Sequence, residues 1–322
     1  MDIKTIGILT SGGDAPGMNA AIRSVVRTAL NDNMNVIGIR RGYAGLIAAD
    51  IVMMQMRSVS EIINRGGTAL YTARCPEFQT EEGQIAAVEN CHKLGIDGMV
   101  VIGGDGSFRG ARALSLRGIP TVAIPGTIDN DIASTDYTIG FDTAINTVVE
   151  MVDRLRDTSQ SHDRCTVVEV MGRRAGDIAL HAGIACGALT ILVPEVPYDF
   201  ERDIVQKMFN TVKSGKHHFI IMVAEGVGNT AELTKRIQAE TGITSRYTVL
   251  GHVQRGGTPT ARERINASRL GYHAVKLLGQ GIGNRVVGLK EDRLVDYDIL
   301  EGLEMKKKFD MELYQIANAI SL

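Results

Sequence analysis

The sequence lacks a long apolar run and any excess of basic residues. Its longest apolar stretches, such as Ala188–Pro194 and Phe219–Ala224, have the length of a strand, whereas a helix that spans a bilayer needs about 20 residues. Lys and Arg number 35 against 37 Asp and Glu, so we expect no contact with nucleic acid or membranes. The first residues lead directly into an apolar stretch and a glycine turn, so we also expect no export signal.

Cysteine and proline are scarce as well. The cysteines stand singly, without a CxxC pair or a histidine at ligand spacing: Cys75, Cys91, Cys165 and Cys186. This distribution predicts reduced thiols and a cytoplasmic location. Glycine and proline, with 36 and 7 residues of 322, stay well below the roughly 25–30% of low-complexity chains. Disorder is therefore excluded as the main character of the chain.

The length of 322 residues suits about two domains of roughly 150 residues each. Short apolar runs alternate with segments of helical period, which is typical of parallel sheets with helices on both faces. The pattern predicts an α/β fold of two three-layer αβα domains with mainly parallel sheets. We expect one domain over 1–140 plus 256–305 and the other over 141–255 plus 306–322. Expected strands are Thr5–Leu9, Val36–Ile39, Gly98–Ile102, Thr121–Ile124, Thr166–Val170, Thr190–Val193, Phe219–Val223, Tyr247–Leu250 and Val286–Leu289, and expected helices include Ala20–Leu30, Ile85–Leu94, Asp203–Val212, Ala231–Thr241 and Ala261–Leu278.

Three of the expected strands end in turns rich in glycine. In open parallel sheets, ligands bind outside the carboxyl ends of the strands. The first turn, Thr10–Asn19, contains Gly12 and Gly13 and precedes a helix. Its backbone N–H groups and the positive end of that helix are suited to hold a phosphate. A tight turn without a ligand is the alternative.

The second turn, Gly103–Ser107, places a carboxylate within a glycine-rich segment. Asp105 is suited to bind Mg²⁺ through one oxygen while neighbouring amides contact phosphate oxygens. Alternatively, Asp105 only caps the helix that begins at Ser107.

The third turn, Pro125–Asp131, carries two carboxylates, Asp129 and Asp131, after Thr127. This spacing suits a site in which one acid abstracts a proton and the other lies near a metal-bound water. Asp and Asn are also ordinary turn formers. Three such turns in one α/β chain favour a functional site over coincidence.

The common nucleotide-binding motifs are missing. No G-x-x-x-x-G-K-[ST] loop is present. Gly226–Ala231 matches the dinucleotide pattern, but the next expected strand, Tyr247–Leu250, ends in Gly251 and His252. A dinucleotide site expects an acidic residue there to hold the ribose. We therefore reject dinucleotide binding.

Basic residues stand next to several expected strands. Met171–Arg174 follows one strand, and His252 and Arg255 follow another, while Arg164 and Arg246 precede strands. Arginine binds phosphate bidentately, although a single arginine of this kind is more often a solvated surface charge. Their positions at strand ends predict a second anion site.

Seven short motifs occur in order over Thr10–Gly257. They are TSGGDAPGMN from Thr10, RGGT from Arg65, ARCPEF from Ala73, VIGGDGS from Val101, PGTIDND from Pro125, VMGR from Val170 and GHVQRGG from Gly251. Together they resemble bacterial ATP-dependent 6-phosphofructokinase, and the likeness spans essentially the whole chain. The resemblance implies the phosphofructokinase fold, a cytoplasmic homotetramer with shared active sites, and Mg-ATP as phosphoryl donor in glycolysis. The acceptor would be the 1-hydroxyl of fructose 6-phosphate, giving the 1,6-bisphosphate and ADP.

The resemblance also implies roles for individual residues. Asp129 would be the general base, with Thr127, Asp131 and Arg173 beside it, and Asp105 would bind Mg²⁺. The residues that would line ATP, with Tyr43 against the adenine, are Gly13, Tyr43, Arg74, Cys75, Gly104, Asp105, Gly106 and Ser107. Those that would bind the sugar phosphate are Thr127, Asp129, Met171, Gly172, Arg173, Glu225, His252 and Arg255, together with Arg164 and Arg246 from a neighbouring subunit.

Two alternatives stand beside this interpretation. The nearest is the same reaction with pyrophosphate as donor. As the resemblance has it, pyrophosphate-dependent members carry Asp in place of Gly106 and Lys in place of Gly126, so these glycines favour ATP. The other is a non-catalytic sensor of sugar phosphate or nucleotide, against which the presence of both Asp105 and Asp129 argues.

The family's effector site is matched only in part. The matching positions are Arg23, Arg27, Arg156, Gly187, Lys216 and His218. The family pattern has an acid where this chain has Leu189, and an arginine where it has Met56. Leucine has no oxygen to hold the effector's Mg²⁺. We therefore expect activation by ADP and inhibition by phosphoenolpyruvate to be weak or absent.

Overall fold

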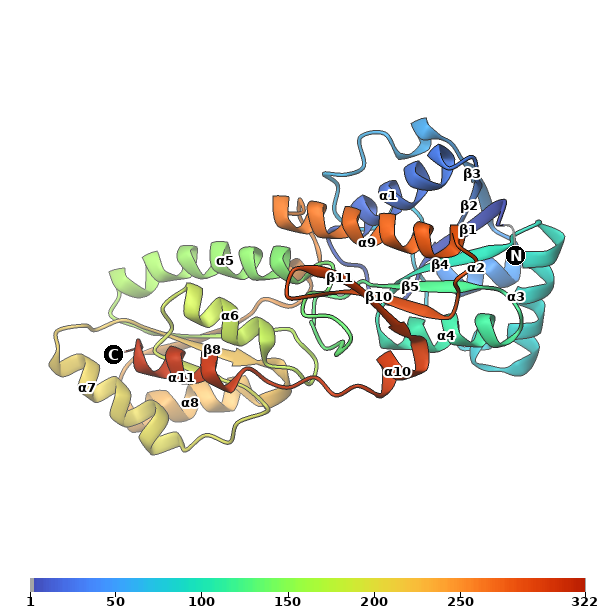
Figure 1. Cartoon of the computed structure of the whole chain (residues 1–322). Helices are drawn as coiled ribbons and strands as arrows, with labels where there is room; N and C mark the ends of the chain where they lie inside the picture. The colour runs from blue at the N-terminus through green and yellow to red at the C-terminus, as the bar shows by residue number, and fades with distance from the viewer. Residues whose placement is uncertain (1–2, 322) are drawn as a thin grey trace. The chain divides into compact units, whose positions relative to one another are not determined.

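The computed structural model describes residues 3–321, which form two compact units (Figure 1). Unit 1 comprises Met1–Ile128, Ile132–Thr143 and Arg255–Lys307, and unit 2 comprises Asp129–Asp131, Ala144–Gln254 and Lys308–Leu322. The short segment Asp129–Asp131 belongs to unit 2, whereas the limits expected from the sequence assign it to the first domain.

Unit 1 is built on a seven-stranded sheet. Its order is β11 (Arg293–Asp298), β10 (Arg285–Lys290), β5 (Thr121–Pro125), β4 (Gly98–Gly103), β1 (Thr5–Thr10), β2 (Asn35–Ile39) and β3 (Ile51–Met54). The strands from β10 to β2 pair in parallel, and β3 and β11 run antiparallel to their neighbours. The α/β class with mainly parallel sheets is thereby confirmed.

The two edge strands are missing from the sequence prediction. Every residue of β4, inside the sheet, is buried, so it stands out as an apolar run. The residues of β11 are all exposed or half-buried, and charged residues interrupt the strand. Strand β11 has only one neighbour and leaves its other side to solvent, so no apolar run marks it. Strand β3 is a short apolar run, Ile51–Met54, which the sequence prediction did not include.

Helices cover both faces of the unit 1 sheet. On one face lie α1 (Met18–Asn31) and α9 (Ala261–Gly279), which pack against each other (Figure 1). The other face carries α2 (Gly42–Ala48), α3 (Glu81–Lys93), α4 (Asp105–Leu116) and α10 (Ile299–Glu304). The core beneath this second group includes Leu9, Ile39, Leu46, Phe108, Leu114 and Ile299. Three layers therefore form, as the parallel sheet predicts.

Unit 2 has a smaller sheet, which is parallel throughout. Its order is β7 (Thr190–Leu192), β8 (Phe219–Ala224), β6 (Cys165–Val170) and β9 (Ser245–Val249). The helices of this unit are α5 (Phe141–Ser161), which begins in unit 1, α6 (Asp177–Ala185), α7 (Lys207–Lys213), α8 (Thr230–Thr241) and α11 (Met311–Ala319). On one face of the sheet, Leu233 and Ile237 of α8 pack with Met208 of α7 in the core.

Two expected elements of unit 2 differ from the structure. The segment expected as one helix over Asp203–Val212 is a π-helical turn, Glu201–Gln206, followed by α7. Strand β9 begins two residues before the expected Tyr247, because Ser245 already pairs with Cys165 of β6. Across the described residues 3–321, none of the helices combines the length and the apolar character that a bilayer span requires.

Candidate active site

The three glycine turns of unit 1 stand at one edge of its sheet. Strands β1, β4 and β5 are parallel neighbours, so their carboxyl ends meet. The Ser11 N–H donates to the Ile102 carbonyl at 2.9 Å, and the Gly126 N–H donates to the Gly103 carbonyl at 2.9 Å. Backbone hydrogen bonds therefore hold the three turns side by side, and Gly12, Gly13 and Gly106 of these turns are exposed.

Gly103 allows this close approach. A Cβ added there would lie 2.4 Å from the Ser11 carbonyl oxygen and 2.4 Å from the Ser107 Oγ. Gly12 is needed for another reason, since its φ of +86° lies in the region that side chains disfavour. The second turn thus requires glycine because atoms of Ser11 and Ser107 occupy the space of a side chain. The first turn requires glycine because of its backbone conformation.

Asp105 occupies the first turn of α4, and Gly104 is the N-cap residue. The alternative in which Asp105 is the helix cap is therefore wrong. Its carboxylate is 48% exposed and pairs with Arg109 one turn later at 3.1 Å. Among residues 3–321 no group of three His, Cys, Asp or Glu is placed to hold a metal. One carboxylate still suits Mg²⁺, which takes most of its oxygen ligands from phosphates and water.

The positions of Gly106 and Gly126 differ in the space around them. A Cβ added at Gly106 meets no atom within 4 Å. At Gly126 the same atom would lie 3.0 Å from Ile102 Cγ2 and 3.0 Å from Met18 Cε. A side chain at position 106 thus extends into open space, whereas one at position 126 has to displace its neighbours.

The residues predicted to line the nucleotide show different degrees of exposure. Tyr43 is 5% exposed, donates from its hydroxyl to the Ser107 carbonyl at 2.7 Å, and stacks on Phe78 with 4.1 Å between ring centroids. Arg74 is exposed, and Cys75 is half-buried with a free thiol. Contact between Tyr43 and an adenine stays a prediction, because Phe78 already covers one face of its ring.

The predicted sugar-phosphate loop follows β6 in unit 2. Oε1 of Glu225 accepts hydrogen bonds from the Gly172 N–H at 3.1 Å and from the Arg173 N–H at 2.6 Å. Both residues have positive φ, +140° and +57°. The guanidinium of Arg173 lies 4.0 Å from Oδ2 of Asp129 and 3.8 Å from Oδ2 of Asp131. Unit 2 therefore brings the predicted base, its neighbouring acid and the predicted arginine together.

Other predicted basic residues lie elsewhere. Arg255 of unit 1 donates to the Asp14 carbonyl at 3.2 Å, beside the first glycine turn. His252 is exposed, and it follows β9. Arg164 precedes β6, and Arg246 pairs with Thr166 near the start of that strand. Six residues of strand extend about 20 Å, so Arg164 and Arg246 stand at the opposite end of unit 2 from Arg173.

The predicted effector residues include a basic cluster in unit 2. Arg156 hydrogen-bonds to the Cys186 carbonyl. Burial and the nearby Arg156 lower the pKa of Lys216, and burial, Lys216 and Arg156 lower the pKa of His218. Leu189 is 1% exposed and belongs to the apolar core of the unit. In unit 2 that position thus offers no polar side chain to a ligand.

The effector residues predicted in unit 1, Arg23 and Arg27, lie on α1. Burial and the charge of Arg27 lower the pKa of Arg23. Gly187 of unit 2 has a φ of +58°. Met56 is exposed.

One buried carboxylate was missed by the sequence analysis. Glu263 of α9 is fully buried, and its Oε2 accepts hydrogen bonds from the Thr143 N–H at 3.2 Å and the Thr143 hydroxyl at 3.1 Å. Burial raises its pKa to about 7. The pattern Thr260-x-x-Glu263 is the signature of a capping box and marks this acid, because the Thr260 hydroxyl caps α9 at the Glu263 N–H.

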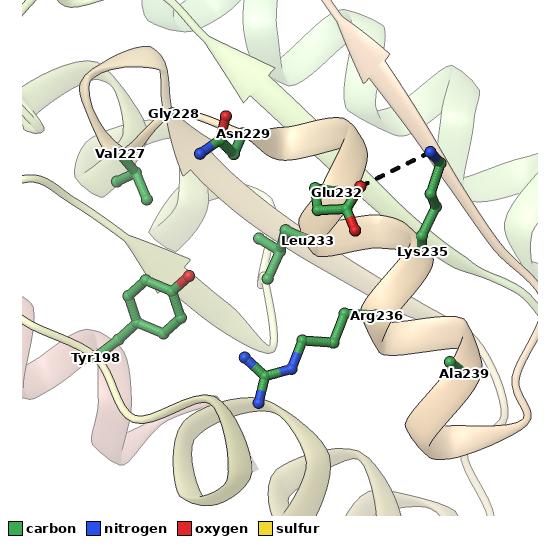
Figure 2. Close-up of a pocket in the computed structure, with 9 residues that line it drawn as sticks. All are labelled: Tyr198, Val227, Gly228, Asn229, Glu232, Leu233, Lys235, Arg236 and Ala239. Atoms are coloured by element: carbon green, nitrogen blue, oxygen red, sulfur yellow. Dashed lines mark ion pairs between the residues drawn. The ribbon is translucent and has the colours of Figure 1, made fainter.

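A separate hollow of about 470 Å³ lies on unit 2, at the start of α8 (Figure 2). Arg236 lies on its wall, 3.8 Å from the centre of the Phe200 ring. The residues that line it are Tyr198, Val227, Gly228, Asn229, Glu232, Leu233, Lys235, Arg236 and Ala239. None of the residues predicted for the active site is among them.

Comparison with known proteins agrees with the motifs. A family model described as Phosphofructokinase matches residues 5–278. A curated relative from Bacillus subtilis (strain 168), named ATP-dependent 6-phosphofructokinase, is 55% identical over 320 residues, which is 99% of this chain and 100% of the relative.

Solved structures agree with the fold. Phosphofructokinase from Saccharomyces cerevisiae superposes with a TM-score of 0.89 at 34% identity over 99% of this chain, and the chain spans about half (48%) of that yeast chain. Pyrophosphate-dependent phosphofructokinase from Marinobacter aquaeolei superposes with a TM-score of 0.87 over 96% of this chain and 86% of its own. At 21% identity the latter likeness concerns the fold alone. The family model matches most of this chain, and the Bacillus subtilis relative aligns with it over essentially the full length of both. Together with the glycine turns at one sheet edge, these matches show that the chain belongs to the phosphofructokinase family.

Proposed function

We propose that the chain transfers the γ-phosphoryl group of ATP to the 1-hydroxyl of fructose 6-phosphate, as a cytoplasmic enzyme of glycolysis. The observation that carries the proposal is 55% identity, over essentially the full length of both chains, to a relative named ATP-dependent 6-phosphofructokinase. The three glycine turns at one sheet edge of unit 1 support it, because phosphoryl transfer depends on positioning and charge neutralisation rather than on covalent chemistry.

In this proposal the glycine turns and Asp105 hold the nucleotide. Backbone N–H groups of the exposed residues Gly12 and Gly13 and the N-terminus of α4 contact phosphate oxygens, and Asp105 supplies a carboxylate oxygen to Mg²⁺. A Mg²⁺ ion held by Asp105 would supply positive charge against the charge that develops on the transferred phosphoryl group. Asp105 exchanges its contact with Arg109 for the metal at little cost, because an exposed ion pair is worth about 0–1 kcal/mol.

Asp129 is the general base of the proposed reaction. The oxygen of the sugar hydroxyl attacks the γ-phosphorus, the bond from that phosphorus to the ADP oxygen breaks, and the hydroxyl proton passes to the Asp129 carboxylate. The Asp129 side chain is 3% exposed, so water competes little for its oxygen. Arg173, whose guanidinium faces both Asp129 and Asp131, orients the carboxylates and binds the sugar phosphate.

The donor is ATP rather than pyrophosphate in this proposal. Open space at Gly106 leaves room for a nucleotide phosphate, and crowding at Gly126 disfavours a lysine there. A coupled assay with fructose 6-phosphate and either ATP or pyrophosphate tests this directly. Turnover with pyrophosphate alone would overturn the assignment of the donor, and binding of both substrates without turnover would favour the non-catalytic sensor.

We further propose a homotetramer in which Arg164 and Arg246 complete the site of a neighbouring subunit. This explains why both stand at the opposite end of unit 2 from Arg173. Coexpression of Asp129→Ser with Arg246→Ala tests the idea, since hybrid assemblies contain some sites with both residues intact. Activity above that of either variant alone supports a shared site. No gain in hybrids that sedimentation shows to have formed contradicts it.

A further inference from the structure

A single buried amide connects two loops of the proposed sugar-phosphate site. Gln254 is 0% exposed and lies in the short helical turn Gly251–Arg255, which follows β9. Its Oε1 accepts a hydrogen bond from the Met171 N–H at 3.2 Å, and its Nε2 donates to the Gly251 carbonyl at 3.0 Å. One end of the side chain must accept and the other must donate, which an amide does at any pH.

The loop that Gln254 contacts adopts a conformation that needs support. Arg173 is a non-glycine residue with a φ of +57°, and such a backbone persists only where its surroundings determine it. Glutamate side chains that follow other strands of unit 2 accept hydrogen bonds from the backbone N–H groups of this loop. Glu225, after β8, accepts from Gly172 and Arg173, and Glu195, after β7, accepts from Gly176 at 2.8 Å.

Gln254 differs from these two acceptors in burial and in reach. Glu195 is exposed and Glu225 is half-buried, so water can replace part of what they provide. The Gln254 amide is out of contact with water, so solvent competes less for its hydrogen bond to the Met171 N–H. Gln254 is also the side chain that bonds both to the loop of Arg173 and to the turn of His252.

We propose that Gln254 is a positioning residue that sets where the Arg173 loop and the His252 turn stand relative to each other. The inference rests on the proposed function, because it assigns these loops to the sugar phosphate. Gln254 does not contact substrate in this account. It acts through the backbone at Met171 and Gly251, so its loss displaces the phosphate-binding groups and leaves the ATP turns of unit 1 intact.

Two substitutions test the two hydrogen bonds of the Gln254 amide. Gln254→Leu removes both hydrogen bonds at similar volume. Gln254→Glu keeps an acceptor for Met171 but, when ionised, places a carboxylate against the Gly251 carbonyl. Protonation of that glutamate restores a donor, so its kinetics should improve as the pH falls. Gln238→Leu is the matched control, because Gln238 also accepts a backbone N–H, from Ser245 at 3.0 Å, but at the start of β9.

Steady-state kinetics with each substrate varied in turn give the readout. We expect kcat/KM for fructose 6-phosphate to fall about 10²-fold in Gln254→Leu, the loss typical of a displacement of about 1 Å, while KM for ATP and the control variant stay near wild type. Gln254→Glu should regain fructose 6-phosphate affinity between pH 8 and pH 6 relative to wild type. This second pattern tests the proposal even where the leucine variant fails to fold.

Three outcomes would overturn the inference. One is an unchanged kcat/KM for fructose 6-phosphate in Gln254→Leu with wild-type turnover. Another is an equal loss for ATP and for the sugar phosphate. The third is a Gln254→Glu variant whose pH profile parallels that of wild type. Failure of the proposed function is distinguishable, because the wild-type protein itself would then not phosphorylate fructose 6-phosphate with ATP.

Discussion

Nε of Arg173 lies 4.0 Å from Oδ2 of Asp129, with the guanidinium 67% exposed and the carboxylate 3% exposed. A buried carboxylate whose neighbouring cation reaches into solvent can exchange that cation for a ligand without unfolding any core. The same guanidinium lies 3.8 Å from Asp131. In the proposed reaction this difference in exposure suits Asp129 to serve as the base and Arg173 to bind the anion.

Replacement of Asp129 tests the base. Asp129→Ser should lower kcat by about 10²–10⁴-fold, the usual contribution of a positioned general base. ATP binding should stay nearly intact, because the nucleotide turns belong to unit 1. Measurement of kcat together with nucleotide affinity by titration checks both statements. Turnover within a few-fold of wild type would disprove the role.

The open space at Gly106 gives a prediction about donor choice. Gly106→Asp should fold normally, since an added Cβ meets no atom within 4 Å. Like charges about 4 Å apart near a protein surface repel by about 4 kcal/mol, so kcat/KM for ATP should drop about 10²-fold or more. Gly126→Lys is the comparison, and crowding by Ile102 and Met18 should lower its Tm. An unaltered kcat/KM for ATP in Gly106→Asp would argue against phosphate contact at this turn.

Glu263 predicts how stability depends on pH. Burial raises its pKa from 4.5 to about 7 in the folded chain, so the folded chain holds this proton more tightly than the unfolded chain. That stabilisation is complete below about pH 4.5 and is lost as the pH rises through about 7. Between pH 5 and pH 8, wild type should lose about 2–3 kcal/mol relative to Glu263→Gln.

Urea denaturation at the two pH values measures this difference. Glu232→Gln serves as control, because Glu232 is an exposed acid in the first turn of α8, and it should follow wild type at both pH values. The assignment fails where Glu263→Gln shows the same pH dependence as wild type.

Burial of Leu189 predicts weak effector control. An apolar side chain, 1% exposed and packed in the core of unit 2, offers no side-chain oxygen to the Mg²⁺ of a bound nucleotide. Curves of rate against fructose 6-phosphate should therefore stay unchanged when micromolar ADP or phosphoenolpyruvate is added. A sigmoidal curve that ADP makes hyperbolic would refute the prediction.

Much of the fold follows from local pattern. Strands such as β4 and β8 are buried along their whole length, so their apolar runs mark them in the sequence. The edge strands β3 and β11 carry exposed or charged residues, although each pairs with the strand that precedes it in the chain. The π-helical turn Glu201–Gln206 has no local signature separating it from an α-helix.

The candidate site likewise has features that the sequence predicts and features that only the folded structure shows. Glycine turns, acidic residues and the motif order identify the family and the class of chemistry. A turn that approaches phosphate needs particular residue types at a few consecutive positions, so the sequence alone shows it. Which residues touch across the chain is a different matter. The Gln254 amide reaches Met171, Glu263 reaches Thr143, and Gly106 faces open space while Gly126 is enclosed. The first two of these relationships join residues that lie 83 and 120 positions apart in the sequence, and only packing of the folded chain creates them.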